Sequence, residues 1–222
     1  MPEDGRMNSR ELESATAAIL AGGRRLGARG LIVAAEGNLS VRVGHRLLVT
    51  PAGRRKDELL ADELLLVPAD PEAPAVDPDR PDLQPTSDLT IHRAVHAARP
   101  DIRAVAHAHL PASLALTLAG EVPDPAVLPE TGLLLPRLPF LELMPMGSPA
   151  LAGAIAAALS DGVEPRAEAV LLSRHGAVAV GSTVDAAVDR LELIELLCRV
   201  WRDARLLGWK PQAEASLGGR GS

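Results

Sequence analysis

The sequence predicts an α/β fold in a single domain over residues 1–211. Segments of strand and helix character alternate along the chain, as in a sheet covered by helices. Of the 222 residues, 47% are hydrophobic and 23% are charged, an ordinary balance for a globular domain of this length. Aromatic residues make up only 1% and tyrosine is absent, so we expect a core of leucine, valine, isoleucine and alanine.

The N-terminal half predicts a helix, several short strands and a second helix. Leu12, Ala15 and Ile19 recur at helical spacing within residues 9–29. Residues 31–43 hold a glycine between apolar stretches and predict strand, tight turn, strand. The other elements expected here are strands at residues 47–49, 64–67 and 102–109, a turn at 50–53, a surface loop at 68–85, and a helix at 87–98 capped by Ser87.

The C-terminal half predicts three helices and a pair of strands. Residues 121–146 hold many prolines and short apolar runs, which indicate short strands and loops. The other elements expected here are helices at residues 111–119, 148–159 and 183–207, strands at 169–172 and 177–180 around a turn, and a disordered tail at 212–222.

The charge pattern does not indicate a nucleic-acid-binding protein. The formal net charge is −6, and the arginines are scattered along the chain. The longest basic cluster is residues 54–56, which Asp57 and Glu58 follow at once. We interpret this cluster as a solvated loop; the alternative is a small contribution to binding an anionic substrate.

A single cysteine, Cys198, excludes an intrachain disulfide and lies in an apolar stretch as a small buried side chain. The first ten residues are polar, and no run of about 18 uncharged apolar residues occurs. We therefore expect a cytoplasmic protein that does not associate with a membrane.

Two histidines stand at positions i and i+2 of a predicted strand, so His107 and His109 project from the same face. Two buried imidazoles on an apolar strand are unfavourable unless a cation is shared between them. The alternative is a polar pair that faces the surface. His175 lies in a glycine-containing turn at a strand end, but sequence spacing alone does not connect it to the pair.

The remaining histidines have other expected roles. His92 and His96 are one helical turn apart, but residue 93 is arginine, so a zinc-protease motif is absent. We expect His92 to be structural or to lie beside the metal, His96 to lie on the helix surface, and His45 to be exposed in a hairpin turn.

Several segments together resemble the class II aldolase/adducin family. They occur in the order and at about the spacing of that family over residues 10–208. The matching segments are Glu36-Gly37-Asn38-Leu39-Ser40-Val41-Arg42, Thr50-Pro51-Ala52-Gly53, Thr86-Ser87-Asp88, His92, Arg99-Pro100-Asp101, Ala104-Val105-Ala106-His107-Ala108-His109 and Arg174-His175-Gly176. The resemblance joins His175 to His107 and His109 as metal ligands.

The resemblance also implies an architecture and an assembly. It implies a three-layer α/β/α sandwich with a mixed, largely antiparallel sheet, and a homotetramer with active sites at subunit interfaces. The residues it places around the phosphate of a small sugar phosphate are Gly37, Asn38, Gly53, Thr86 and Ser87. Glycine allows an anion to approach the backbone, and Thr86 and Ser87 lie at a predicted helix N-terminus, where an anion is favoured.

The activity implied is that of a lyase of carbohydrate metabolism that cleaves a sugar phosphate by a retro-aldol reaction. A divalent cation, zinc or else manganese or cobalt, would stabilise the charge left on the ketone fragment. Asp88 is the candidate for moving the proton. The alternatives are an epimerase, dehydratase or decarboxylase on the same scaffold, or an adducin-like interaction domain without catalysis; the three histidines argue against the last.

The sequence departs from the family pattern at several positions. Asp88 stands where aldolase members usually have glutamate, and epimerase members use aspartate there as a metal ligand. Ala52 replaces a residue that often supplies a hydroxyl group to the phosphate. The tyrosines that serve as proton donors in the family have no counterpart, because the chain has none. Glu130 is either a catalytic group that takes their place or a surface loop residue.

Overall fold

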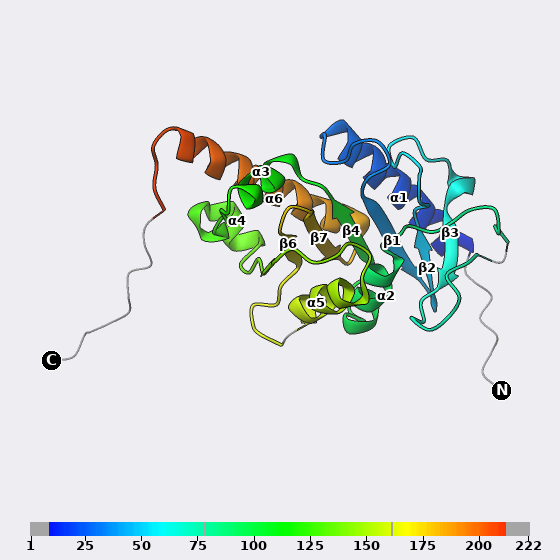
Figure 1. The fold of residues 1–222 in the computed structure, drawn as a ribbon. Coiled ribbons are helices and arrows are strands. Elements are labelled where there is room, and N and C mark those ends of the chain that lie inside the picture. The colour runs from blue at the N-terminus through cyan, green and yellow to red at the C-terminus, as the bar shows by residue number, and fades with distance from the viewer. Residues whose placement is uncertain (1–8, 78, 161, 212–222) are drawn as a thin grey trace.

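A computed structural model describes residues 9–77, 79–160 and 162–211, and its centre is a seven-stranded sheet (Figure 1). The strands are β1 (Asn38–Val43), β2 (Arg46–Val49), β3 (Leu65–Pro68), β4 (Ala104–Ala108), β5 (Phe140–Leu141), β6 (Ala169–Leu172) and β7 (Gly176–Gly181). Their order across the sheet is β3-β2-β1-β4-β7-β6-β5. All neighbours pair antiparallel except β5 and β6, which run parallel, so the predicted mixed, largely antiparallel sheet is confirmed.

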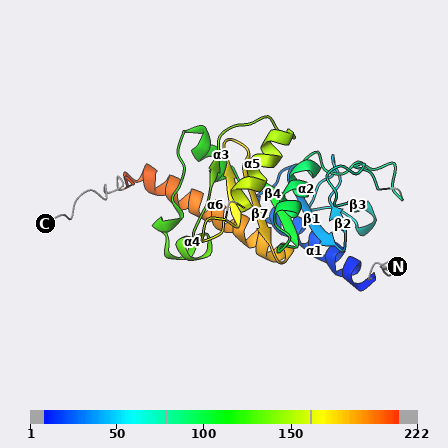
Figure 2. The same cartoon turned by 90° about the horizontal axis from the view of Figure 1, so that it is seen from below.

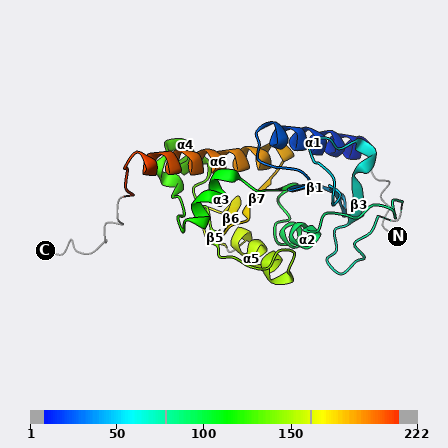
Figure 3. The ribbon, with the colours of Figure 1, turned by 45° about the horizontal axis from the view of Figure 1, so that its top comes forward.

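Helices cover both faces of this sheet (Figure 3). One face carries α1 (Ser9–Ala28) and α6 (Val184–Leu206), and the opposite face carries α2 (Leu89–Ala98) and α5 (Pro149–Ser160). The view from below places α2 and α5 in front of the strands (Figure 2). Two shorter helices, α3 (Pro111–Leu118) and α4 (Pro129–Leu134), contact α6. The three-layer sandwich expected from the sequence is therefore confirmed.

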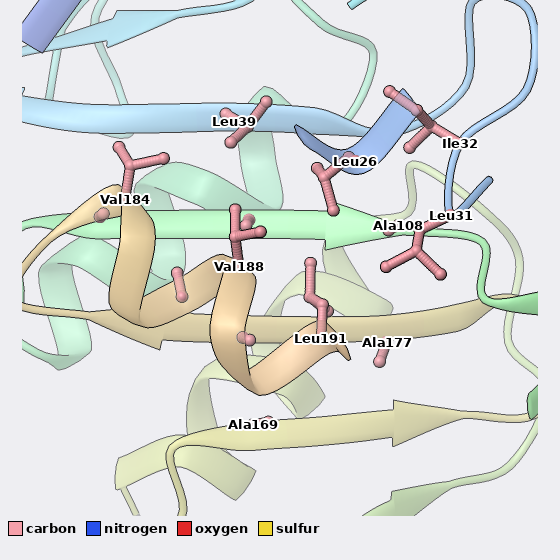
Figure 4. Packing of buried hydrophobic residues seen from close by; sticks show 14 of the residues in the cluster. Leu26, Leu31, Ile32, Leu39, Ala108, Ala169, Ala177, Val184, Val188 and Leu191 are labelled. Carbon is pink, nitrogen blue, oxygen red and sulfur yellow. The ribbon is translucent and has the colours of Figure 1, made fainter. Parts of the chain in front are cut away.

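The two faces of the central strands carry different side chains. Toward α6, β4 and β7 present alanines, such as Ala108 and Ala177, on the side of Val188 and Leu191 (Figure 4). These small side chains let the helix lie close to the strands. Toward α2 and α5, the same strands present larger side chains such as Val105. Because strand side chains alternate, His107 shares the α2 face with Val105.

The structure corrects two sequence predictions of secondary structure. Residues 31–37 form a turn and irregular chain instead of the first of the two strands predicted within residues 31–43, because Ala34 and Gly37 have φ angles of 52° and 68°, outside the strand region. Residues 121–146 contain two short helices, Pro125–Val127 and α4, besides the expected strand and loops. Each of these helices begins with proline, whose fixed φ suits the first helical turn.

Two smaller points concern helix ends and hydropathy. The N-cap position of α2 is Asp88 rather than the predicted Ser87, and a further 3₁₀ turn spans Ala61–Glu63. Within the described part of the chain, every helix is too short or too polar to cross a membrane. The predicted tail at residues 212–222 lies outside the described residues.

Candidate metal centre and adjoining cavity

His107, His109 and His175 converge on one point at the end of β4. One ring nitrogen of each lies within 4.8 Å of the others. The ring centroids are 4.9 Å apart for His107 and His109, 4.9 Å for His107 and His175, and 5.1 Å for His109 and His175. The three histidines that the resemblance joined therefore lie together.

The turn before β7 brings His175 to this point. Gly176 has a φ of 106°, and a Cβ atom there would lie 2.1 Å from the carbonyl oxygen of Ala108. Only glycine allows the turn to lie this close to β4. Arg174, the residue before His175, also has a positive φ of 54°, and its backbone N–H donates to Thr117 Oγ1 at 3.0 Å. The tight turn thus sets the position of His175 against β4.

The neighbours of His107 and His109 favour one tautomer of each ring. His107 Nδ1 donates to the carbonyl oxygen of Ala177 at 2.9 Å, which leaves a lone pair on Nε2. His109 Nδ1 lies 3.4 Å from Glu36 Oε1, which favours a proton on Nδ1 and a lone pair on Nε2. The two Nε2 atoms are 3.1 Å apart. Two lone pairs that face each other at this distance repel unless a proton or a cation lies between them.

A divalent cation fits this arrangement. Two imidazole ligands on tetrahedral zinc have their nitrogens roughly 3.3 Å apart, given bonds of about 2.0–2.1 Å. Burial lowers the pKa of His107 to about 3, with a further contribution from the neighbouring imidazoles, and burial also lowers the pKa of His175. Neutral imidazole is the form that binds metal ions.

Asp88 lies beside the histidines, at the N-terminus of α2. Its Oδ2 atom is 4.0 Å from His107 Nε2 and accepts a hydrogen bond from Asn38 Nδ2 at 2.8 Å. Burial acts to raise the pKa of Asp88, but the imidazole of His107 and the bond from Asn38 outweigh it and lower the pKa. The carboxylate is therefore ionised at neutral pH.

A buried chain of hydrogen bonds continues from Asp88 beneath the sheet. Asn38 Oδ1 accepts from His92 Nε2 at 2.6 Å, and His92 Nδ1 then accepts from Ser40 Oγ at 2.7 Å. Ser40 Oγ in turn accepts from His96 Nε2 at 3.0 Å. This direction leaves a lone pair on His96 Nδ1, which is the one buried atom of that ring without a partner. The chain fixes the rotamer of Asn38 and, through it, the carboxylate of Asp88.

The positions of three other histidines test the sequence interpretation. His92 is fully buried, as expected of a structural residue, and His45 is exposed in the hairpin turn, as expected. The prediction that His96 lies on the helix surface is wrong, since it is 1% exposed. It lies on the face of α2 that packs on Ser40 of β1. Burial lowers the pKa of His92 to about 4 and that of His96 to about 3.

A cavity of about 300 Å³ opens beside the histidines. Its walls include Asp88, His109 and His175 together with all residues expected to surround a phosphate, namely Gly37, Asn38, Gly53, Thr86 and Ser87. Backbone bonds join two of these walls, since the Thr86 N–H donates to the Thr50 carbonyl at 3.0 Å and the Ala52 N–H to the Gln84 carbonyl at 2.9 Å. The predicted site residues thus come from separate segments and meet at one place.

Two predictions have a different outcome. Glu130 is exposed on α4 and does not belong to the residues lining the cavity, so its catalytic role stays a prediction. The basic cluster at residues 54–56 is solvated at Arg54 and Arg55, but Lys56 is 2% exposed and lines the cavity. Interpreting the whole cluster as a solvated loop was therefore wrong for Lys56.

Glu36 and Ser40 were predicted only as part of a segment that resembles the family, and Lys56 only through the alternative that its basic cluster contributes to binding an anionic substrate. Ser40 had a signal, because polar residues alternate with Leu39 and Val41 along β1 and so share a face with Asn38. Glu36 and Lys56 lie in turns, where the sequence carries no period from which to place a side chain.

Comparisons with known proteins agree with this geometry. A model of the class II aldolase and adducin N-terminal domain matches residues 17–202. The chain is 31% identical over 188 residues to a 5-methylthioribulose-1-phosphate/5-deoxyribulose-1-phosphate aldolase of Rhodospirillum rubrum, covering 81% of this chain and 76% of that protein. It is 34% identical over 209 residues to a probable bifunctional methylthioribose-1-phosphate isomerase/methylthioribulose-1-phosphate dehydratase of Nocardia farcinica, covering 88% of this chain but only 37% of that protein.

A solved structure is similar over nearly the whole chain. The L-fuculose-1-phosphate aldolase of Thermus thermophilus superposes with a TM-score of 0.75 at 28% identity, covering 92% of this chain and all of that one. The relatives found thus include aldolases and a probable bifunctional isomerase/dehydratase.

Proposed function

Since the chain belongs to the class II aldolase and adducin N-terminal domain family, we propose that it is a divalent-metal-dependent aldehyde-lyase that cleaves a small sugar phosphate by a retro-aldol reaction. The observation that carries the proposal is the convergence of His107, His109 and His175, whose ring nitrogens lie within 4.8 Å of one another beside the cavity. His175 completes the set of three imidazoles, and the cavity beside them has room for a small substrate.

The metal would be held by His107, His109 and His175, and zinc is the cation that suits three neutral imidazoles with an open position. Manganese and cobalt also accept this ligand set. When bound, the cation would act as a Lewis acid on the substrate oxygens and stabilise the negative charge left by carbon–carbon cleavage.

Asp88 is the residue that we propose to move the proton. Its carboxylate is ionised, lines the cavity and lies close to the histidines. The substrate hydroxyl group whose proton must leave during cleavage would lie near the same carboxylate. The hydrogen bond from Asn38, itself held by His92, would keep the carboxylate in one orientation.

The phosphate of the substrate would lie among Gly37, Asn38, Gly53, Thr86 and Ser87. Gly37 and Gly53 leave the backbone accessible, while Thr86 and Ser87 supply hydroxyl groups at the start of α2. Free backbone N–H groups at a helix N-terminus attract anions. The phosphate end of the substrate would then contact these residues, and the opposite end would contact the histidines.

A second candidate is an epimerase, dehydratase or decarboxylase of a sugar phosphate on the same scaffold. The 4.0 Å between Asp88 Oδ2 and His107 Nε2 favours it, because an aspartate this close could serve as a fourth metal ligand. The probable bifunctional isomerase/dehydratase among the relatives also supports it. An adducin-like interaction domain without catalysis is disfavoured by the complete histidine set.

The assembly that we propose is a homotetramer with active sites at the subunit interfaces, as the resemblance implies. Light scattering tests it, and a monomer mass would contradict it. In such an assembly the catalytic role proposed for Glu130 is tested by Glu130→Gln, which should lower turnover without lowering the metal content.

Release of dihydroxyacetone phosphate from a panel of ketose 1-phosphates tests the reaction. Zinc-loaded protein should release it, a chelator should stop the release, and added zinc should restore it. His107→Ala should be inactive, and His45→Ala, which changes an exposed histidine, should retain full activity. If the protein binds zinc stoichiometrically but releases no product, the epimerase, dehydratase or decarboxylase proposal replaces the aldolase.

A further inference from the structure

Lys56 lies in the cavity wall, and two carbonyl groups hold its ammonium. The side chain follows the turn after β2 and is 2% exposed, although the neighbouring Arg55 side chain is 49% exposed. Its Nζ atom donates to the carbonyl oxygens of Ala35 and Arg54, each at 2.6 Å. These bonds tie the segment before β1 to the turn after β2, so the ammonium has a fixed position.

The charge of Lys56 lacks a counter-ion. Both of its hydrogen-bond acceptors are neutral carbonyl groups, and among the described residues no carboxylate forms an ion pair with it. Burial lowers its pKa from 10.5 to about 8, against the weaker opposite effect of Asp88. A buried cation that is hydrogen-bonded but not neutralised is unfavourable, and an anion beside it would remove most of that cost.

The ammonium also retains a donor. A lysine has three N–H groups, and the two carbonyls occupy two of them. Lys56 is the only lysine or arginine lining the cavity within the described part of the chain; the other titratable groups there are Glu36, Asp88, His109 and His175. A negatively charged group that enters the cavity therefore meets one positive side chain that is already in position.

We propose that Lys56 is the cation that neutralises the phosphate group of the substrate, through its third N–H. That the phosphate belongs to a sugar rests on the proposed function. That the cavity binds an anion rests on the position of Lys56 in its wall. Inorganic phosphate and a sugar phosphomonoester present the same kind of anionic group to this ammonium. Because the ammonium is held in place before the ligand arrives, little side-chain entropy is lost on binding.

Binding of inorganic phosphate and of a ketose 1-phosphate to the zinc-loaded full-length chain, measured by calorimetry, tests the proposal. Lys56→Gln keeps an N–H donor for the carbonyls but removes the charge, and it should weaken both ligands by roughly 30-fold. Lys56→Arg keeps the charge and should retain most of the affinity. Arg55→Gln, the matched control on the exposed neighbour, should bind as the wild type does. Wild-type affinity in Lys56→Gln would overturn the proposal.

A second measurement needs no substitution at Lys56 and so holds even if the variant fails to fold. The chain has only two lysines, Lys56 and Lys210, and Lys210 is exposed. Labelling with [13Cε]lysine should therefore give two NMR signals whose titration yields both pKa values. Saturating inorganic phosphate should raise the pKa of Lys56 above its starting value of about 8 and leave that of Lys210 unchanged. Saturation without a change at Lys56 would overturn the proposal.

The two proposals fail separately. Phosphate binding that depends on Lys56 in a protein that cleaves no ketose phosphate would contradict the proposed reaction and support the role of Lys56. Cleavage by the wild type, with unchanged phosphate affinity in Lys56→Gln, would contradict the role of Lys56 alone. Comparing the ketose 1-phosphate with inorganic phosphate and with the unphosphorylated ketose separates recognition of the phosphate from recognition of the sugar.

Discussion

The two faces of β4 differ in what they bury. The face toward α6 carries only alanines from this strand, packed beneath an apolar helix surface that includes Val188 and Leu191. The opposite face begins with Val105 in an apolar cluster and continues to His107, where the buried groups are polar. The same five-residue strand thus belongs to an apolar core on one side and to the candidate site on the other.

The difference teaches how the fold accommodates polar groups that folding alone would not favour. Burying the imidazoles of His92, His96 and His107 together with a carboxylate opposes folding unless each group has a partner. The continuous apolar packing between the sheet and α6 provides stability that does not depend on these partners. Substitutions on the α6 face should therefore change stability, and substitutions on the α2 face should change chemistry.

The largest expected effect is on turnover. Asp88→Asn keeps the shape of the side chain and an oxygen that can accept from Asn38, but removes the charge. Turnover of the cleaved substrate should fall by about 10²–10⁴-fold, because a general base is lost. Zinc content, measured by atomic emission, should not change if Asp88 is a base, and should fall if Asp88 is a ligand. Asp62→Asn, at an exposed carboxylate, is the control; wild-type turnover in Asp88→Asn would contradict the assigned role.

On the apolar face the effect should be on stability alone. Leu191→Ala removes a fully buried side chain between α6 and the strands, and should lower the free energy of unfolding by about 2–5 kcal/mol. Leu196→Ala, on the same helix but 49% exposed, should change it by about 0.5 kcal/mol or less. Denaturant unfolding measures both. A folded Leu191→Ala variant that has lost zinc binding would contradict the claim that substitutions on the α6 face change stability alone.

A substitution in the buried chain of hydrogen bonds should change both stability and turnover. Ser40→Ala leaves His92 Nδ1 and His96 Nε2 without their shared partner, which should cost about 2–3 kcal/mol of stability. Turnover should also fall, since Asn38 is held less firmly through His92, while zinc content stays at the wild-type value. Denaturant unfolding and steady-state kinetics check the two effects. Unchanged stability would mean that the chain of hydrogen bonds contributes nothing to the fold.

The smallest expected effect is a pH dependence due to Lys56. Its pKa is about 8 in the folded chain and 10.5 in its ordinary state, so between these values the unfolded chain binds more protons. Stability should therefore rise with pH across that window, by on the order of 1–2 kcal/mol. Burial raises the pKa of Cys198 to about 12, which has the opposite effect above pH 9. Cys198 is present in both proteins, so the difference in free energy of unfolding between wild type and Lys56→Gln reports on Lys56 alone. A difference that does not vary with pH would contradict the lowered pKa of Lys56.

The periodicity of apolar residues in strands and helices was enough to predict most of the fold. The alternation of Leu39 and Val41 with polar residues, and the i, i+2 spacing of His107 and His109, place side chains on definite faces without knowledge of the partner strands. The first strand predicted within residues 31–43 does not form, because the φ angles of Ala34 and Gly37 decide the path of residues 31–37, and apolar content does not reveal those angles. The short helices within residues 121–146 were missed because their apolar positions are too few to define a period.

The candidate site was only partly predictable for the same reason. His175 joined the histidine pair through the family resemblance, since a tight turn carries no period that fixes where its side chain points. His96 was predicted on the surface because few apolar residues lie beside it in the helix sequence to mark a buried face. Its contact with Ser40, from a strand distant in the sequence, shows that this face is buried. Lys56 lies beside two exposed arginines, and the sequence does not distinguish it from them.

The most direct test of the central claim is the zinc stoichiometry of the wild type and of three single variants, His107→Ala, His109→Ala and His175→Ala. The wild type should bind one zinc ion per chain after equilibrium dialysis, and each variant should lose tight binding, because each removes one of the three converging imidazoles. Full stoichiometry retained in all three variants would contradict the metal centre and, with it, the proposed reaction.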